Sequence, residues 1–238
     1  MELPNALYLG IGGIATLLAF GVFRDHYDRQ WVLRGDVTAN RLRLYARTMI
    51  VLWSLAALCV LSWRVAGFDL ASLGFKVPSG WRAWVSFSVV GLAIAQLGFV
   101  VYRAAVSEEA RENVRRKLES GARLDLIMPG SAREHRRFRG LALTAGTTEE
   151  IIFRGFLIGT LAMVLPLWVA AAVATLVFVL AHAYQGTTGM LRTIPISALL
   201  AVLFVIGGSL WPVMLLHAAA DLIGGEASRL AYSKPPTS

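Results

Sequence analysis

The sequence has few charged residues and almost no cysteine. Charged residues make up 16% of the 238 positions and hydrophobic residues 56%, whereas an average soluble domain has about 25% charged residues and about 45–50% apolar ones. The one cysteine, Cys59, lies inside an apolar block, so it cannot form an internal disulfide and is interpreted as a small buried hydrophobe. The shortage of charge excludes an ordinary soluble domain.

Several signatures of enzymes and transporters are also absent. There is no His-Glu-x-x-His, which disfavours a zincin-like membrane metalloprotease. There is no Gly-x-Gly-Asp to support a membrane aspartyl protease, and Gly207-Gly208-Ser209-Leu210 is not the Gly-x-Ser-Gly of a rhomboid-like serine protease. No glycine-rich phosphate loop is present. An inverted-repeat transporter gains no support, because the sequence has no internal repeat.

The net charge of +8 comes from basic residues that lie between the apolar blocks. This placement is typical of the cytoplasmic loops of membrane proteins. No aromatic-basic motif accompanies these residues, so nucleic-acid binding is not expected.

Apolar blocks follow one another along most of the chain. A bilayer-spanning helix needs about 20 predominantly apolar residues. The sequence therefore predicts an all-α integral membrane protein, a polytopic bundle of about seven transmembrane helices, or eight if one segment splits or re-enters. The predicted spans cover residues 7–23, 48–63, 81–102, 141–165, 167–182, 194–207 and 210–224.

Charge sets the expected orientation of these spans. Glu2 stands where a cleavable signal peptide has a basic region, so the first apolar run is expected to be a retained span with its N-terminus outside. The hydrophilic loop 24–47 and the stretch 103–139, both rich in arginine, then lie in the cytoplasm. The compact chain without eukaryotic sorting signals indicates a bacterial inner membrane. The expected parts are a three-span N-terminal region (1–106), a cytoplasmic basic linker helix (107–137), a core (138–225) and a polar tail without a fold (226–238).

The fourth predicted span carries two adjacent carboxylates, Glu149 and Glu150, followed by Arg154. Ionisable residues inside spans are costly and by default indicate a functional site. Glu150 and Arg154 are spaced i,i+4, which predicts a neutralised ion pair on one helix face. Glu149 is rotated about 100° away from that face and is predicted to be the free carboxylate. The alternative is that both glutamates only hold helices together.

Two more polar groups lie in the later spans. His182 ends the fifth span, one turn after Phe178, and the seventh span carries His217 and Asp221. The spacing i,i+4 places His217 and Asp221 on one helix face, and the alanines between them allow another helix to approach closely. Taken singly, His182 could be a capping or headgroup residue and His217 a partner in an interhelical hydrogen bond. Together with Glu149 they predict a shared site in the cytoplasmic half of the bundle.

These residues, in this order, resemble the motifs of the CPBP family of membrane proteins. The motifs are Glu-Glu-x-x-x-Arg at 149–154, Phe-x-x-x-His at 178–182 and His-x-x-x-Asp at 217–221, and residues 186–189 and 208–212 are also similar to the family. The family includes the CaaX prenyl proteases and the bacteriocin-processing, abortive-infection-like proteins. The resemblance covers roughly residues 138–225 and implies peptide-bond hydrolysis in a cavity open to the cytoplasm.

By this resemblance, Glu149 deprotonates the attacking water, His182 helps to position that water, and His217 and Asp221 polarise the scissile carbonyl. Glu150, Arg154 and Phe178 support the site. Asp221 departs from the pattern, because the prenyl proteases usually carry asparagine there and an ionised carboxylate cannot donate to an oxyanion. Asp221 could instead orient His217 or complete a metal site.

The sequence leaves the cofactor and the activity open. The preferred mechanism needs no cofactor, but a divalent metal such as zinc could be held by His182, His217, Asp221 and Glu149. The expected activity is that of an intramembrane endopeptidase acting on a membrane-associated, prenylated or unprenylated, peptide or lipid-modified protein. The alternatives are a non-enzymatic membrane scaffold or immunity protein that retains these residues, and a proton-coupled transporter.

Overall fold

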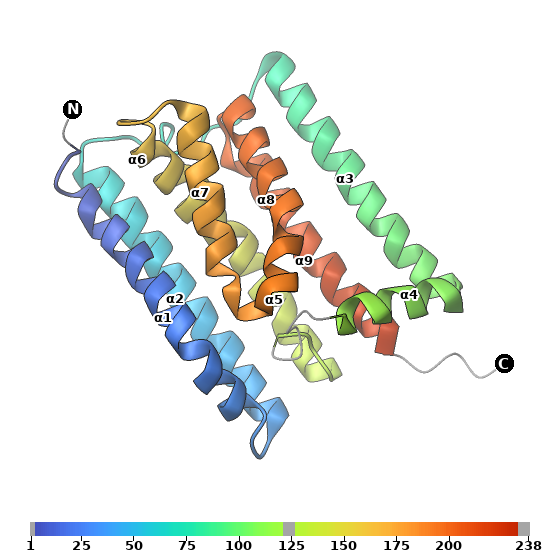
Figure 1. The fold of residues 1–238 in the computed structure, drawn as a ribbon. Helices are drawn as coiled ribbons and strands as arrows, with labels where there is room; N and C mark the ends of the chain where they lie inside the picture. The colour runs from blue at the N-terminus through green and yellow to red at the C-terminus, as the bar shows by residue number, and fades with distance from the viewer. Residues whose placement is uncertain (1–2, 121–126, 233–238) are drawn as a thin grey trace.

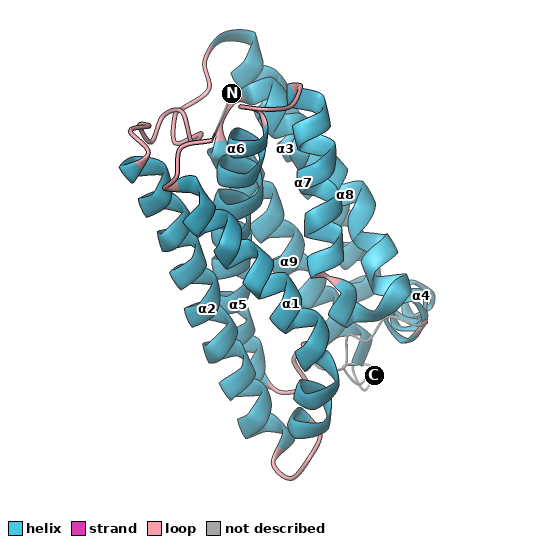
Figure 2. Ribbon diagram, turned by 60° about the vertical axis from the view of Figure 1, so that its left-hand side comes forward, coloured by secondary structure: helices cyan, strands magenta, loops and turns pink. Residues whose placement is uncertain are grey.

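The computed structural model describes residues 3–120 and 127–232, with the backbone alone described over residues 20–29. Over this part of the chain all regular structure is helical and no strand occurs (Figure 2). The all-α class predicted from the sequence is therefore confirmed. Figure 1 shows the long helices running side by side as a bundle, with a short helix lying across one end.

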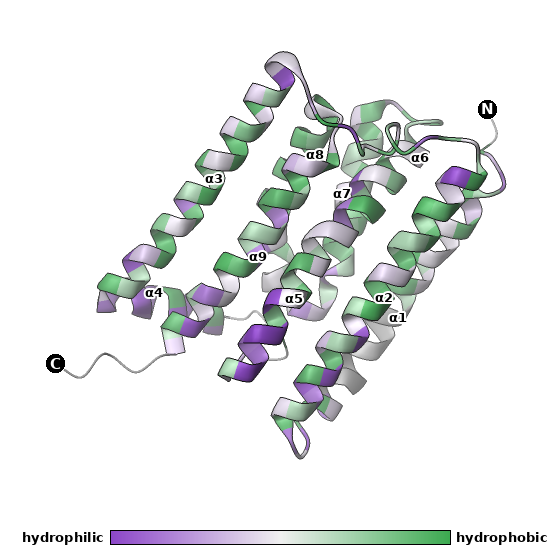
Figure 3. Ribbon diagram, turned by 180° about the vertical axis from the view of Figure 1, so that it is seen from behind, coloured by the Kyte–Doolittle hydropathy of each residue, from purple (hydrophilic) through white to green (hydrophobic). Residues whose placement is uncertain are grey.

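The helices, in chain order, are α1 (Leu7–Val32), α2 (Val37–Val65), α3 (Gly80–Val106), α4 (Glu108–Glu119), α5 (Ala132–Glu149), a π-helical segment η2 (Glu150–Ile158), α6 (Gly159–Leu161), α7 (Leu167–Ala181), a 3-10 turn η3 (Ala183–Gln185), α8 (Gly186–Gly207) and α9 (Leu210–Tyr232). The short crossing helix is α4, which has no buried residue and covers only the first part of the linker helix predicted at 107–137. The hydrophilic end of the bundle is the end where α4 lies and α5 begins (Figure 3).

Three helical segments among the described residues are long and apolar enough to cross a membrane. They are α2, α3 and the segment from Ala183 to Gly207. The apolar stretches in α1 (Leu7–Ala19) and α7 are shorter. The chain is thus an all-α membrane protein, but the count of seven spans is not supported by length and hydropathy. One physical reason for the lower count is that Glu149 and His217 are themselves polar, so they lower the mean hydropathy of the helices that carry them.

Two predicted boundaries are wrong. The loop predicted at 24–47 is only a few residues long in the structure, because α1 continues to Val32 and α2 begins at Val37. Hydropathy marks where a helix leaves the apolar layer, whereas arginine favours helix on both sides of that boundary. Asp36 fixes the start of α2 by accepting a hydrogen bond from the Ala39 amide at 2.9 Å. Likewise the tail predicted to lack a fold at 226–238 is helical as far as Tyr232, and its remaining residues lie outside the described part.

Helices α5 and α9, which carry Glu149 and His217, pack closely against each other. A Cβ added at Gly146 would lie 2.5 Å from the backbone nitrogen of Ala218, so the two helices touch backbone to backbone. A second small residue, Gly225, meets the ring of Phe138 further along the same pair of helices. Small residues at helix crossings are the usual means of close packing in membranes. Gly146 lies one turn before Glu149, and Ala218 is adjacent to His217.

Because α5 and α9 are in contact at Gly146, adding one methyl group at this position should destabilise the protein. Gly146→Ala would push α9 away from α5, because the obstructing atoms are backbone, and we expect it to lower the free energy of unfolding by about 1–3 kcal/mol. Gly91→Ala on α3 is the matched control, since a Cβ there meets nothing within 4 Å. That control should be neutral or stabilising by up to about 1 kcal/mol. Unfolding of the purified protein in detergent measures both, and equal stability of the two variants would contradict the contact.

Candidate active site

The structure brings together the four residues that were predicted to form the site. They come from three separate helical regions. The Oε2 atom of Glu149, at the end of α5, lies 4.0 Å from Nε2 of His182 and 3.8 Å from Nε2 of His217. His182 caps the C-terminus of α7, and His217 lies in α9. Asp221, one turn further along α9, places Oδ2 3.8 Å from the same His217 nitrogen. The four side chains therefore form one cluster around Glu149 and His217.

Glu149 and Glu150 each have one carboxylate oxygen, Oε2, that is buried without a hydrogen-bond partner among the described residues, and that of Glu149 faces two imidazoles. The Glu149 side chain is only 15% exposed, and within the described residues nothing hydrogen-bonds its buried Oε2. The two imidazoles that face this oxygen are beyond direct hydrogen-bond distance. A buried, unsatisfied polar atom in a native fold calls for an explanation such as catalysis or an additional bound group.

Glu150 is fully buried and holds two partners at once. Its Oε1 accepts a hydrogen bond from Nη1 of Arg154 at 3.0 Å, which confirms the predicted ion pair. The same oxygen lies 2.6 Å from Nδ1 of His217. The second contact was not predicted, because it joins residues 67 positions apart and leaves no trace in local spacing. Glu150, and not Asp221, is thus the group that fixes the orientation of His217.

Arg154 extends this network to a fourth region of the chain. Its Nη2 donates to both the hydroxyl and the backbone carbonyl of Ser197, at 2.9 Å and 3.1 Å. Its guanidinium carbon lies 4.3 Å from the centre of the Phe178 ring, a cation–π distance. Ser197, a buried residue of α8, is a supporting residue that the sequence reasoning missed. A lone serine in an apolar block gives no signal of such a role.

His182 is oriented by the helix that it ends. Its Nδ1 lies 2.9 Å from the carbonyl oxygen of Phe178. A carbonyl only accepts hydrogen bonds, so Nδ1 carries the proton and donates it. In the neutral imidazole, Nε2 then presents a lone pair toward Glu149. The Phe178 ring, whose centre is 4.4 Å from that of His182, packs against the imidazole from one turn earlier.

A π-helical segment begins directly after Glu149. It runs from Glu150 to Ile158, and all of its residues are buried. Such segments are rare and occur frequently at functional sites, because their wider turn displaces side chains from ordinary helical positions. Hydropathy and spacing gave no indication of it.

The alternative zinc set is not assembled as a metal-holding group in the described part of the chain. Over the described residues, no group of three or more histidine, cysteine, aspartate or glutamate side chains is arranged to hold a metal ion. Asp221 is also the most exposed member of the alternative zinc set, at 38% of its side chain.

Comparison with protein families finds one family that is similar to the part of the chain that carries these polar residues. Residues 137–223 match the family model described as type II CAAX prenyl endopeptidase Rce1-like. The resemblance to the CaaX prenyl proteases is confirmed on nearly the same residues as the motifs, and the family supports an intramembrane endopeptidase. No curated protein and no solved structure matches the chain.

Because one oxygen of Glu150 binds both Arg154 and His217, replacing Glu150 should destabilise the protein more than replacing Ser197. Glu150→Gln removes the charge that compensates buried Arg154 and should cost about 3–5 kcal/mol of unfolding free energy. Ser197→Ala removes one of the two acceptors of Arg154 Nη2 and should cost about 1 kcal/mol. Unfolding titrations in mixed detergent micelles measure both variants. Equally small losses would show that the Glu150 carboxylate is not a central acceptor.

Proposed function

We propose that this protein is an intramembrane endopeptidase in which Glu149 activates the attacking water. The observation that carries the proposal is the unsatisfied Oε2 of Glu149 facing Nε2 of both histidines at 4.0 Å and 3.8 Å. Polar atoms at such distances are commonly bridged by water. A water held there would meet a general base and an orienting imidazole at the same time.

The protonation state of His182 determines how that water is held. Because Nδ1 donates to Phe178, Nε2 accepts one hydrogen of the water, and Glu149 Oε2 accepts the other. Both acceptors leave the water oxygen lone pairs free for attack. As the oxygen bonds to the peptide carbonyl carbon, its proton moves to Glu149. Glu149 then passes the proton to the leaving nitrogen as the C–N bond breaks.

His217 is the group proposed to stabilise the oxyanion. Its Nδ1 is fixed on Glu150, so its Nε2 points into the space beside Glu149 and Asp221. In the protonated form Nε2–H donates to the developing oxyanion, while Glu150 retains Nδ1–H. A preorganised donor of this kind typically contributes about 3–4 kcal/mol to catalysis. Asp221 supports the same step by its charge beside the imidazole, and as an ionised group it does not donate.

The proposed substrate is a membrane-associated peptide, with a prenylated CaaX-type peptide as the first candidate. Glu149 directly precedes the buried, apolar segment η2, and this position favours substrates that enter from the bilayer or its surface. The Rce1-like family of residues 137–223 supports the same class.

Replacing the general base tests this proposal. Glu149→Gln should lower cleavage of a quenched prenylated peptide by about 10²–10⁴-fold, because the amide cannot take the water proton. The assay uses purified protein in detergent, with an unprenylated peptide in parallel and with a chelator arm. Glu112→Gln, an exposed carboxylate on α4, is the matched control and should retain full activity.

The outcomes separate the mechanisms. Activity that survives the chelator and is lost in Glu149→Gln supports a metal-free glutamate peptidase. Loss of wild-type activity with the chelator assigns Glu149 and the histidines to a metal mechanism instead. Equal activity of wild type and Glu149→Gln would contradict the role of Glu149, and equal behaviour of the two in cells would favour the scaffold.

The membrane topology forms part of the same proposal. All seven long helical regions cross the bilayer, with the N-terminus outside and the active site toward the cytoplasm. The support is the hydrophilic end of the bundle, where α4 lies and the arginine-rich start of α5 is found (Figure 3).

Cysteine labelling tests that orientation in intact cells. In a Cys59→Ala background, Arg34→Cys between α1 and α2 should react with a membrane-impermeant maleimide only after the membrane is opened. Ser79→Cys, which precedes α3 at the opposite end, should react without opening. Both positions are exposed, so access depends on the side of the membrane. The reverse pattern would overturn the orientation, and labelling of both positions from one side would overturn the span count.

A further inference from the structure

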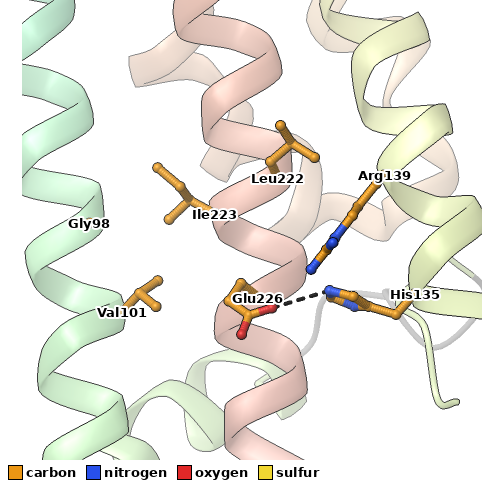
Figure 4. Close-up of a pocket in the computed structure, with 7 residues that line it drawn as sticks. All are labelled: Gly98, Val101, His135, Arg139, Leu222, Ile223 and Glu226. Carbon is orange, nitrogen blue, oxygen red and sulfur yellow. Dashed lines mark ion pairs between the residues drawn. The ribbon is translucent and has the colours of Figure 1, made fainter. Parts of the chain in front are cut away.

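A pocket opens between α3, α5 and α9. Its volume is about 460 Å³, and it is lined by Gly98, Val101, His135, Arg139, Leu222, Ile223 and Glu226 (Figure 4). This volume is within the range of small-molecule sites, about 300–1,000 Å³. Arg139 precedes Glu149 by ten positions, about 15 Å along the helix, so the polar side of the pocket lies away from Glu149, although its apolar residue Leu222 directly follows Asp221.

The polar side of the pocket is formed by His135, Arg139 and Glu226. Arg139 makes no ion pair or hydrogen bond within the described residues, and Figure 4 shows its side chain directed toward Glu226. His135 is only 8% exposed, and its Nδ1 is buried without a hydrogen-bond partner. Its Nε2 lies 3.2 Å from Glu226. The donor available to an anion is therefore the exposed guanidinium of Arg139, since Nδ1 of His135 is buried and Nε2 faces Glu226.

The one acidic group in the pocket already has a cationic partner. Glu226 accepts a hydrogen bond from Nε of Arg229, one turn later on α9, at 2.9 Å. Glu226 is opposed by both Arg229 and Arg139, so the sum of these three charges at the pocket is positive. The polar side therefore favours an anion over a cation.

The opposite side of the pocket is apolar and leaves room for a chain. Val101, Leu222 and Ile223 contribute aliphatic side chains. A Cβ added at Gly98 would meet nothing within 4 Å, so a strip of open space runs beside α3 at this position. A free anion needs only the polar side, whereas an amphipathic ligand would use both.

The three helices change from apolar to charged at the level of this pocket. On α3 the apolar run ends at Arg103, and on α9 the aliphatic Ile223 is followed by Glu226. On α5 the order is reversed, because the arginines that begin the helix give way to apolar residues after Arg139. Arginine at such a boundary is typical of the level of lipid headgroups.

We propose that this pocket binds an anionic phospholipid. Its phosphate would accept hydrogen bonds from the Arg139 guanidinium, and an acyl chain would lie along the open strip at Gly98. Arginine is well suited to phosphate because its planar fork can donate two parallel hydrogen bonds. The proposal concerns a second site and does not depend on the peptidase activity.

Retention of defined lipids by the full chain tests the proposal. The purified protein is delipidated, supplied with phosphatidylglycerol, phosphatidylethanolamine or phosphatidylcholine, and analysed by native mass spectrometry. We expect wild type to retain phosphatidylglycerol preferentially, and Arg139→Gln and Gly98→Leu to retain it at least fivefold less. Arg136→Gln, an exposed arginine one turn earlier that does not line the pocket, should bind like wild type.

Three results would overturn the proposal. Equal retention of phosphatidylglycerol by Arg139→Gln and wild type would show that the guanidinium does not bind the phosphate. Equal retention of the three lipids by wild type would show a nonselective apolar surface. Displacement of phosphatidylglycerol by soluble glycerol phosphate at similar concentration would assign the pocket to a free anion. Thermal unfolding of each variant checks its fold, and Arg139→Gln alone decides the question if Gly98→Leu is unstable.

Discussion

A single buried oxygen, Oε1 of Glu150, organises the polar interior of this membrane protein. It binds Arg154 on its own helical segment and His217 on α9, and Arg154 in turn binds Ser197 on α8. Burying a charge in an apolar bundle is costly unless the charge is paired and hydrogen-bonded. Each member of this chain therefore needs the others, and together they fix how three helices meet. Glu149, the residue before Glu150, takes no part in these hydrogen bonds.

Close backbone contact between α5 and α9 also determines the geometry of the site. The hydrogen bond between Glu150 and His217 is short, and a helix side chain reaches its partner at that distance only if the helices themselves are close. Gly146 and Ala218 provide this approach, one turn from Glu149 and one residue from His217. In lipid, such packing substitutes for a hydrophobic driving force between helices, since the surrounding acyl chains are as apolar as the helices. Geometry at the site is thus set by glycine and alanine as much as by charge.

The sequence predicted the helical class, the ion pair of Glu150 with Arg154 and the meeting of Glu149, His182, His217 and Asp221 in one place. These were predictable because each rests on local spacing or on the cost of charge in a membrane. It did not predict the link from Glu150 to His217, the contact of Arg154 with Ser197, the π-helical segment or the pocket at Arg139. Each of these depends on which helix faces which, and that information is carried by shape complementarity over long separations. The roles of the four clustered residues in catalysis remain predictions.

The error in the helix ends and the weak hydropathy of some helices have a common origin. Hydropathy reports the apolar layer, whereas a helix continues wherever its backbone can be hydrogen-bonded, as α1 and α9 do beyond their apolar runs. Conversely, the mean hydropathy of a helix that carries a buried site falls with each polar residue in it. Such a helix is stable in the bundle because protein, not lipid, surrounds its polar face. The helices least recognisable as membrane spans are therefore the ones expected to hold the chemistry, and in this chain they are the helices of Glu149 and His217.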